Sequence, residues 1–359
     1  MNILGLSYYY HDSAAALLQD GILTAAAEEE RFSRRKHDSG FPHLAIEFCL
    51  NQAGIEAKNL DYVVFYEKPL TKLDRIFKTS LNTFPRSSAV FREALLSWTN
   101  QKLWIKGELT QYLKLPADKV LFVEHHISHA ASAFFCSPFE KAAVLTIDGV
   151  GEWTTAAMGH GTADWTGEGV NQIQLTHDVR FPNSLGLLYS AFTAFLGFEI
   201  NEGEYKVMGM APYGKPRYVD KIYQMIRVAG DGSFQLDMDY FSYPYSLNRT
   251  FSDKFVELFG KPRHPNSEFM TEDTHDDITG HEAEVKINRY YADIAASIQR
   301  VTEEIVLKMA NHLHKETGLD NLCMAGGVAL NSVANGRILR ETHFKDVFIH
   351  PAPGDSGGA

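Results

Sequence analysis

Apolar and polar positions alternate along the chain in a pattern that predicts one strand–turn–strand unit twice. The first copy has three consecutive strands at Asn2–Ser7, Ser13–Leu18 and Gly21–Glu28, with polar turns between them. The second copy repeats this order at Ala142–Ile147, Thr154–Gly159 and Asn171–Thr176. Helices and further short apolar strands follow each copy, and we expect them at His43–Ala53, Asp61–Glu67, Lys119–Val123, Ser184–Leu196, Glu284–Thr317, Asn321–Ala325 and Val347–Ile349.

The duplicated pattern predicts an α/β protein with two similar lobes that face a cleft. This layout is typical of the duplicated ribonuclease-H-like fold of actin, Hsp70 and sugar kinases. We place the first lobe at residues 1–138, with a helical insertion at about 70–115, and the second lobe at residues 139–359, with a polar surface insertion at about 229–285. The length of 359 residues fits two lobes of roughly 100–200 residues each.

The segment between the two copies carries the most distinctive chemistry. His125 and His129 lie four residues apart in a run of small residues, so a helix there places both imidazoles on one face, at a spacing that suits a shared metal ion. A strand then delivers Asp148 into a turn, which adds a carboxylate to a site with open positions. Chance is the alternative, because a chain with 15 histidines contains such pairs fairly often. A zinc protease is excluded, since His126 occupies the place of the glutamate in H-E-x-x-H.

Charge and composition narrow the choice of partners. The net charge of −11 argues against a nucleic-acid partner, although Arg34, Arg35 and Lys36 form either a clamp for a small anion or an ordinary solvated charge run. The three cysteines have no paired spacing, which indicates reduced thiols in a cytoplasmic protein. No apolar run is long enough for a membrane helix, and the first residues do not form a signal peptide.

Two glycine-containing segments are candidates for ligand binding. Gly326 and Gly327, between a strand and a helix, suit phosphate binding at a helix N-terminus, and a plain turn is the alternative. Gly203, Glu204 and Lys206 belong to a segment punctuated by glycine and proline, which we interpret as a rigid loop around a ligand or as a tight inter-helix turn.

Two further turns carry titratable residues. His11 and Asp12 lie in the first turn and face the same side as Asp148 if the lobes are duplicates, although either side chain could simply bond the backbone there. Asp355 follows a strand in a glycine-rich turn, where it could add a second carboxylate to the metal site.

Read together, these segments resemble the O-carbamoyltransferase family of nodulation protein U and the cephem and tobramycin carbamoyltransferases. The resemblance rests on L-G-L-S-x(4)-D-S-A-A-A-L-L-x-D-G, A-E-E-E-R-F-S-R-x-K-H, H-H-x-S-H-A, T-I-D-G-x-G-E, E-G-E-Y-K-V-M-G-M-A-P-Y-G and G-G-V-A-L-N. These motifs span essentially the whole chain and resemble the family's N-terminal domain, which is similar to the tRNA threonylcarbamoyladenosine synthase. Family members normally continue into a nucleotide-binding domain that resembles YrdC, so we expect this chain to be truncated before it.

The resemblance implies transfer of a carbamoyl group from carbamoyl adenylate to a hydroxyl of a small-molecule or glycan acceptor. The C-terminal domain would make the adenylate from ATP and carbamoyl phosphate. The implied metal is Fe(II), with zinc or manganese as alternatives, and it would polarise the carbamoyl carbonyl. The implied enzyme is cytoplasmic and biosynthetic, and a homodimer is left open.

The resemblance also implies roles for residues. The metal would be held by His125, His129, Asp148 and Asp355. The adenylate would be lined by Gly203, Glu204, Lys206, Gly326, Gly327 and Asn331, and the substrate by Arg34 and Lys36. His11, with Asp12 beside it, is our candidate for the base, because a neutral imidazole accepts a proton near pH 7.

Three other functions are weighed against this one. A tRNA threonylcarbamoyl transferase uses the same chemistry, and the acidic net charge argues against it. An ATP-dependent phosphotransferase of the actin-like fold would hold Mg²⁺ with oxygen ligands, which the histidine pair does not suit. A metal-binding or regulatory domain without activity is the third. The sequence does not identify the acceptor.

Overall fold

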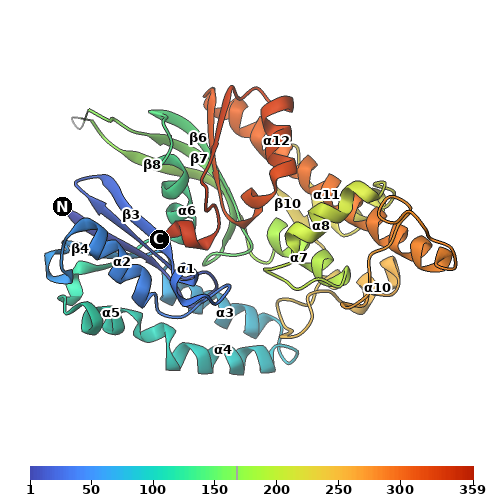
Figure 1. Ribbon diagram of the computed structural model, residues 1–359, viewed down its shortest axis with the longest axis horizontal. Coiled ribbons are helices and arrows are strands. Elements are labelled where there is room, and N and C mark those ends of the chain that lie inside the picture. Colours follow the sequence, from blue (N-terminus) through green and yellow to red (C-terminus); the bar gives the residue numbers. More distant parts are fainter. Residues whose placement is uncertain (167–168) are drawn as a thin grey trace.

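Two five-stranded sheets with the same internal arrangement form the framework of the computed structural model, which describes residues 1–166 and 169–359 (Figure 1). The first sheet has the order β3-β2-β1-β4-β5 and the second has the order β12-β11-β6-β7-β8. Their strands are β1 (Asn2–Ser7), β2 (Ala14–Gln19), β3 (Ile22–Glu28), β4 (Tyr62–Phe65), β5 (Val120–Phe122), β6 (Lys141–Ile147), β7 (Thr154–Thr162), β8 (Gln172–Arg180), β11 (Asn321–Ala325) and β12 (Asp346–Ile349).

The pairing of the strands shows that the two lobes repeat one topology. In the first lobe β1 pairs antiparallel with β2 and parallel with β4, and β4 pairs parallel with β5. In the second lobe β6 pairs antiparallel with β7 and parallel with β11, and β11 pairs parallel with β12. This repeat is the duplicated ribonuclease-H-like α/β fold, so the fold predicted from the sequence is confirmed.

Helices cover the sheets and fill the two insertions (Figure 1). They are α1 (Glu30–Ser33), α2 (His43–Ala53), α3 (Pro69–Asn82), α4 (Ser88–Asn100), α5 (Ile105–Leu113), α6 (His125–Phe134), α7 (Leu185–Phe195), α8 (Glu204–Met210), α9 (Val219–Ile222), α10 (Asp253–Phe259), α11 (Glu282–Thr317) and α12 (Ser332–Glu341). Two short strands, β9 (Ile226–Val228) and β10 (Phe234–Leu236), pair with each other. No helix of the described chain is both long and apolar enough to cross a membrane.

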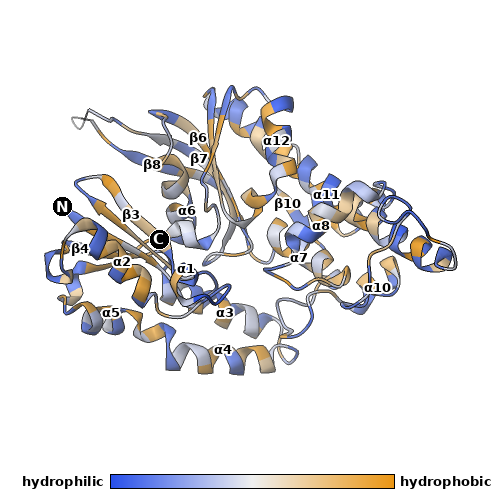
Figure 2. Ribbon diagram, viewed as in Figure 1, coloured by the Kyte–Doolittle hydropathy of each residue, from blue (hydrophilic) through white to orange (hydrophobic). Residues whose placement is uncertain are grey.

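The long helix α11 organises the core of the second lobe. Apolar residues recur along it at helical spacing, and its C-terminus is closed by Gly318 in the left-handed conformation. Its buried face packs against α7 and the second sheet, where Phe192 and Ile298 are fully buried. Orange strands and the orange inner faces of the helices mark this core in Figure 2.

Two segments differ from the elements that the sequence predicts. The segment containing Gly203, Glu204 and Lys206 was expected to be a rigid loop, but most of it forms α8, because Glu204–Met210 holds no residue that stops a helix until Pro212. The segment at about 229–285 was expected to lie on the surface, yet three of its aromatic side chains, Phe251, Phe255 and Phe259, are buried against the core of the second lobe.

The end of the described chain connects the lobes. After β12 the chain leaves the second sheet and forms a short 3-10 helix at Asp355–Gly358. This turn packs against β1 and α6, and a Cβ at Gly5 would lie 2.5 Å from the backbone carbon of Ala359. The residues that follow β12 therefore reach the first lobe, and in Figure 1 the C-terminus lies beside its strands.

Candidate metal centre and adjoining cleft

Helix α6 carries both histidines into the space between the lobes. Its small residues Ala130 and Ala133 pack against the second sheet, which lets the helix approach closely. The helix turns His125 and His129 to the same side, as their spacing predicts. At its start, the carboxylate of Glu152 accepts the backbone N–H of His125 at 3.1 and 3.2 Å, which satisfies a donor that the helix itself leaves free.

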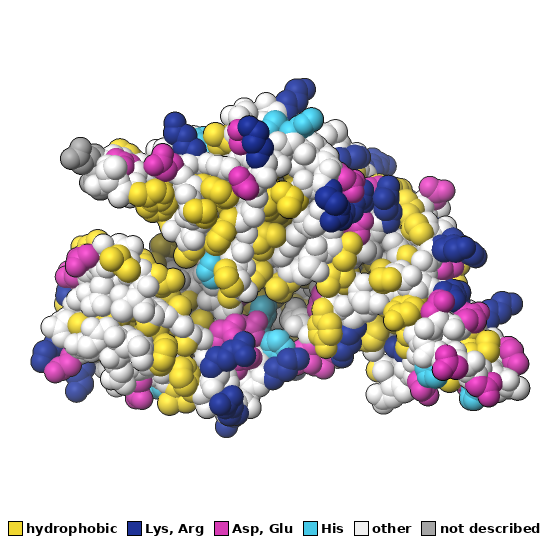
Figure 3. Space-filling model, turned by 45° about the horizontal axis from the view of Figure 1, so that its top comes forward, with side chains coloured by type: hydrophobic (Ala, Val, Ile, Leu, Met, Phe, Trp, Pro, Cys, Tyr) yellow, Lys and Arg dark blue, Asp and Glu magenta, His cyan; other side chains and the backbone are white. Residues whose placement is uncertain are grey.

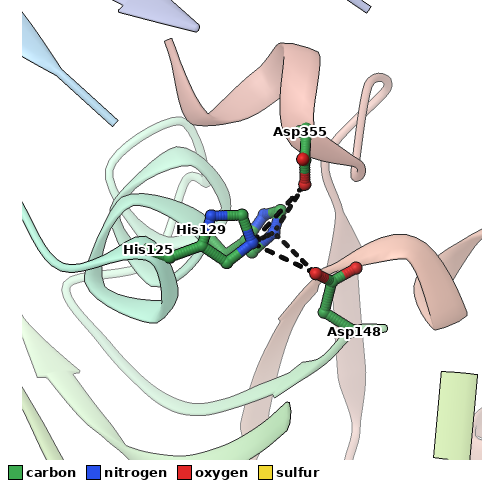
Figure 4. Close-up of side chains that lie close together, drawn as sticks. All are labelled: His125, His129, Asp148 and Asp355. Atoms are coloured by element: carbon green, nitrogen blue, oxygen red, sulfur yellow. Dashed lines mark hydrogen bonds and ion pairs between the residues drawn. The ribbon is translucent and has the colours of Figure 1, made fainter. Parts of the chain in front are cut away.

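Four side chains from three elements converge at this point (Figure 4). His125 Nε2 lies 3.1 Å from Asp148 Oδ2, 3.5 Å from Asp355 Oδ1 and 3.1 Å from His129 Nε2. His129 Nε2 lies 3.5 Å from Asp355 Oδ1 and 3.9 Å from Asp148 Oδ2. All four residues are buried, and one ligand atom from each lies within 4.8 Å of all the others.

The electrostatics of the metal-free cluster show why it favours a cation. Burial opposes protonation of His125, but the carboxylates of Asp355 and Asp148 outweigh it and raise the pKa to about 9. Burial also opposes ionisation of the two carboxyls, yet the imidazoles hold the pKa of Asp148 and of Asp355 below its usual range. Without a metal, a proton on His125 therefore balances part of the negative charge.

The donor set fits a divalent transition metal. Two imidazole nitrogens and two carboxylate oxygens are the ligand types that Fe(II), Zn(II) and Mn(II) accept, and the two carboxylates balance the charge of the ion. The Nδ1 atoms of His125 and His129 are buried without a hydrogen-bond partner among the described residues. No hydrogen bond from the described residues to Nδ1 therefore fixes either ring. Both rings point their Nε2 atoms toward the carboxylates.

The third histidine of α6 is not part of the cluster. Burial, followed by the neighbouring imidazoles, lowers the pKa of His126 to about 3 and keeps the ring neutral. Its Nδ1 lies 2.7 Å from the hydroxyl of Thr146 and its Nε2 lies 2.9 Å from the carbonyl of Thr154. His126 therefore fastens α6 to the second sheet.

Backbone at two glycines holds the cluster in place. Gly327 N–H donates to Asp148 Oδ1 at 2.9 Å, and Gly326 N–H donates to the carbonyl of Pro353 at 2.7 Å. Gly326 has a φ of +94° and lies against the backbone of Ile147, so a side chain there would be strained and would collide with that strand. Both N–H groups are thus engaged inside the protein, and the two glycines position Asp148.

His11 and Asp12 form a hydrogen-bonded group on the first lobe. Asp12 Oδ2 lies 2.8 Å from His11 Nδ1, and Asp12 Oδ1 lies 2.7 Å from His37 Nδ1. Burial opposes protonation of His11, but Asp12, Asp355 and Asp148 raise its pKa above the usual value. Burial favours the neutral form of the Asp12 carboxyl, but the two imidazoles outweigh burial and lower its pKa. Asp12 thus orients both rings and leaves His11 Nε2 free of this carboxylate.

The other predicted residues lie around this centre without joining the cluster. Lys36 Nζ lies 3.6 Å from Glu202 Oε1 and thus links the first lobe to the segment before α8, whereas Arg34 is exposed. Lys206 is exposed on α8, and Glu204 accepts the hydroxyl of Ser190 at 2.8 Å. Asn331 caps α12 through the N–H of Ala334.

Sequence reasoning assigned no role to Glu152. It lies in the T-I-D-G-x-G-E motif four residues after Asp148, and besides His125 it accepts the backbone N–H of Lys68 at 2.7 Å. A Cβ at Gly151 would lie 2.9 Å from the His125 ring, so this turn packs directly on the histidine. The only sequence signal for Glu152 was its place in this motif, which does not indicate which groups the carboxylate binds.

A hollow separates parts of the two lobes on the face of the molecule that Figure 3 shows. Figure 3 shows the hollow between the lobes, with basic, acidic and histidine side chains gathered at one end of it. The geometry therefore defines a two-lobed protein of the duplicated ribonuclease-H-like class with a candidate metal centre at the junction of its lobes.

Comparison with known proteins identifies the family. A family model described as the carbamoyltransferase N-terminus matches residues 2–359, and the chain belongs to this family. An uncharacterised protein of Synechocystis is 50% identical over 366 residues, which covers 100% of this chain and 55% of that protein. The nodulation protein NolNO of Sinorhizobium fredii is 32% identical, covering 92% of this chain and 42% of that protein.

More distant similarities add little beyond the fold. The crystal structure of HypF from T. kodakarensis is 14% identical with a TM-score of 0.44, covering 99% of this chain and 46% of that one. A tRNA N6-adenosine threonylcarbamoyltransferase of Prochlorococcus marinus is 34% identical over 61 residues, or 17% of this chain. The chain spans about half the length of the curated relatives that it matches over most of its own length.

Proposed function

We propose that this chain transfers a carbamoyl group from carbamoyl adenylate to a hydroxyl of a small-molecule or glycan acceptor. The observation that carries this proposal is the buried cluster of His125, His129, Asp148 and Asp355 at the junction of the lobes, within a carbamoyltransferase family member. The adenylate would come from ATP and carbamoyl phosphate through a separate activity.

The bound divalent metal, Fe(II) first, would supply Lewis acidity toward the carbamoyl carbonyl and the nucleotide oxygens. His125, His129, Asp148 and Asp355 would hold it, and Glu152 fixes His125 through the start of α6. The adenylate would lie against the second lobe, along Gly203, Glu204, Lys206, Gly326, Gly327 and Asn331. Arg34 and Lys36 would contact substrate from the first lobe.

His11 would accept the proton of the acceptor hydroxyl. In the neutral state its Nδ1–H donates to Asp12, so Nε2 presents its lone pair for the proton. The acceptor hydroxyl then attacks the carbamoyl carbon, a C–O bond forms, and AMP leaves with the electron pair of the broken bond to its phosphate oxygen. Asp12 is a positioning residue in this scheme, because it acts through His11.

The test is transfer from synthetic carbamoyl adenylate, run anaerobically with the metal-loaded chain and a panel of hydroxylated acceptors. Formation of a carbamate ester together with AMP is the expected result, with loss in His129→Ala and retention in Asp346→Asn, which alters an exposed aspartate. AMP release without any carbamate product would contradict the proposal. Carbamoyl transfer confined to tRNA would favour the threonylcarbamoyl-type alternative. The short match to a tRNA N6-adenosine threonylcarbamoyltransferase is the reason to weigh this alternative.

A further inference from the structure

A second group of charged residues lies on the first lobe, outside the residues assigned above. Helix α3 carries Lys72 and Arg75, and Lys102 begins a 3-10 turn after α4. Lys72 and Arg75 are buried and Lys102 is half-buried. Three cations thus lie in a part of the protein where water reaches them poorly.

The nearby carboxylates are already engaged by other groups. Glu67 forms an ion pair with Lys72, and Glu152 accepts the backbone N–H groups of Lys68 and His125. Within the described ranges, the side chains of Arg75 and Lys102 have no hydrogen bond and no ion pair.

Arg75 is the more informative of the two. Its side chain is only 8% exposed, and its guanidinium carbon lies 5.0 Å from the centre of the Phe181 ring in the second lobe. A guanidinium has five N–H donors, and those of Arg75 have no acceptor among the described residues, although none of its nitrogens is among the fully buried unpartnered atoms. Oxygens of an anion that reaches this guanidinium would supply acceptors for these donors.

The ring of Tyr10 connects this group to the proposed catalytic base. The centre of the Tyr10 ring lies 4.7 Å from the His11 ring, 4.7 Å from Lys72 Nζ and 6.0 Å from Lys102 Nζ. Lys72 and Lys102 are therefore separated from His11 by a single aromatic ring. Burial, with Lys72 and Arg75 adding to it and Glu67 opposing it, lowers the pKa of Lys102 to about 8.

We propose that Arg75 and Lys102 bind an oxyanion, a phosphate or carboxylate group, of the substrate that reacts beside His11. Assigning the oxyanion to a reacting substrate rests on the proposed function, whereas the binding site itself does not. Two substrates could supply the group, namely an acidic acceptor or the donor carbamoyl adenylate through its phosphate. Arg75 suits either, because its planar donors bind such oxygens in pairs.

The first test measures binding of inorganic phosphate by calorimetry to the full chain, with metal removed so that phosphate cannot bind the metal centre. Arg75→Gln should weaken binding by ~10- to 100-fold, the usual effect of losing a charge-assisted hydrogen bond. Arg75→Lys should lose less, and Arg92→Gln, an exposed arginine on α4, should bind like the unaltered chain. The absence of saturable binding in the unaltered chain, or equal binding in Arg75→Gln, would overturn the proposal.

A stability measurement separates a binding role from a structural one. Without phosphate, Arg75→Gln should melt at a higher temperature than the unaltered chain, because burial disfavours the charge of Arg75 more than the neighbouring Glu67 and Glu152 favour it. With phosphate the unaltered chain should gain stability and the variant should not. A guanidinium that merely packs against Phe181 predicts the reverse, namely a less stable variant at every phosphate concentration.

A competition series identifies the source of the oxyanion. Phosphate displaced through Arg75 by AMP, which carries the phosphate of the donor, but not by glucose 6-phosphate or glucuronate, would assign the site to the donor. Displacement by the anionic sugars and not by neutral glucose would assign it to an acidic acceptor. Phosphate binding that depends on Arg75, in a chain that transfers no carbamoyl group, would leave the oxyanion site standing while the proposed function fails.

Discussion

Metal binding at the four-residue cluster should be strongly coupled to pH, because the metal must displace the proton that His125 holds. The pKa of His125 is raised to about 9, so below that pH binding of one ion releases one proton from this ring. The apparent affinity should therefore rise up to ~10-fold per pH unit between about pH 7 and 9 and level off above that.

The same linkage fixes the sign of the stability changes. A histidine whose folded pKa lies above its unfolded value of 6.5 stabilises the metal-free fold fully below that pH, and this contribution is lost as the pH rises through 9. Metal at 100 times its Kd should add about 2.7 kcal/mol, or roughly 5–10 °C in Tm for a lobe of this size. The metal-free chain thus loses stability across a pH range in which the stabilisation added by the metal grows.

Calorimetric melts and metal titrations with Zn(II), and anaerobically with Fe(II), at several pH values measure both effects. Asp355→Asn keeps the size of the side chain but removes a ligand and the strongest electrostatic cause of the raised His125 pKa. Metal-induced stabilisation should fall sharply in this variant, and the remaining pH dependence should move to lower pH. Equal stabilisation in Asp355→Asn and the unaltered chain, or affinity independent of pH, would refute the reasoning.

Three further predictions concern residues around the cluster. Glu152→Ala leaves the N–H groups of His125 and Lys68 without an acceptor and should lower the free energy of unfolding by about 1–3 kcal/mol, measured by urea denaturation; an unchanged midpoint would contradict the role of Glu152. Asp12→Asn should move the acidic limb of the pH–rate profile for carbamoyl transfer to lower pH, because Asp12 raises the pKa of His11; an unmoved limb would remove His11 as the base. Lys102→Met should stabilise the chain below pH 8, because the folded protein disfavours the charged amine of Lys102. This gain in stability should fade as the pH rises toward 10.5, and a loss of stability at pH 7 would contradict the prediction.

The regular elements could be predicted because their patterns are local. The strands of both sheets and the bounds of α2 follow directly from apolar periodicity, and the repeat of one pattern indicated the duplicated fold. Helix α8 was missed because its glycines and Pro212 indicate a loop. Phe255 and Phe259 lie four residues apart in a polar segment, so their burial depends on a tertiary contact that local pattern does not reveal.

The candidate site was only partly accessible from the sequence. His125 and His129 were found from their spacing and Asp148 from its place after a strand, whereas Asp355 was only a possible second carboxylate from its glycine-rich turn until the family resemblance implied it as a ligand. Arg75 gave no signal, since a lysine- and arginine-rich amphipathic helix is usually a solvated surface. Its significance depends on burial and on the lack of a partner, and neither property can be read from composition.

The arrangement of the ligands makes the metal centre a link between the lobes. Asp148 follows β6 of the second sheet, whereas Asp355 belongs to a turn that leaves that sheet and packs against β1 of the first. Two buried carboxylates that repel each other are thus anchored on different parts of the fold, with α6 between them. Because a divalent ion balances both charges, its binding should draw these parts together. Lys36 with Glu202, and Arg75 with Phe181, also join the two lobes, so metal and substrate would act on one interface between the lobes.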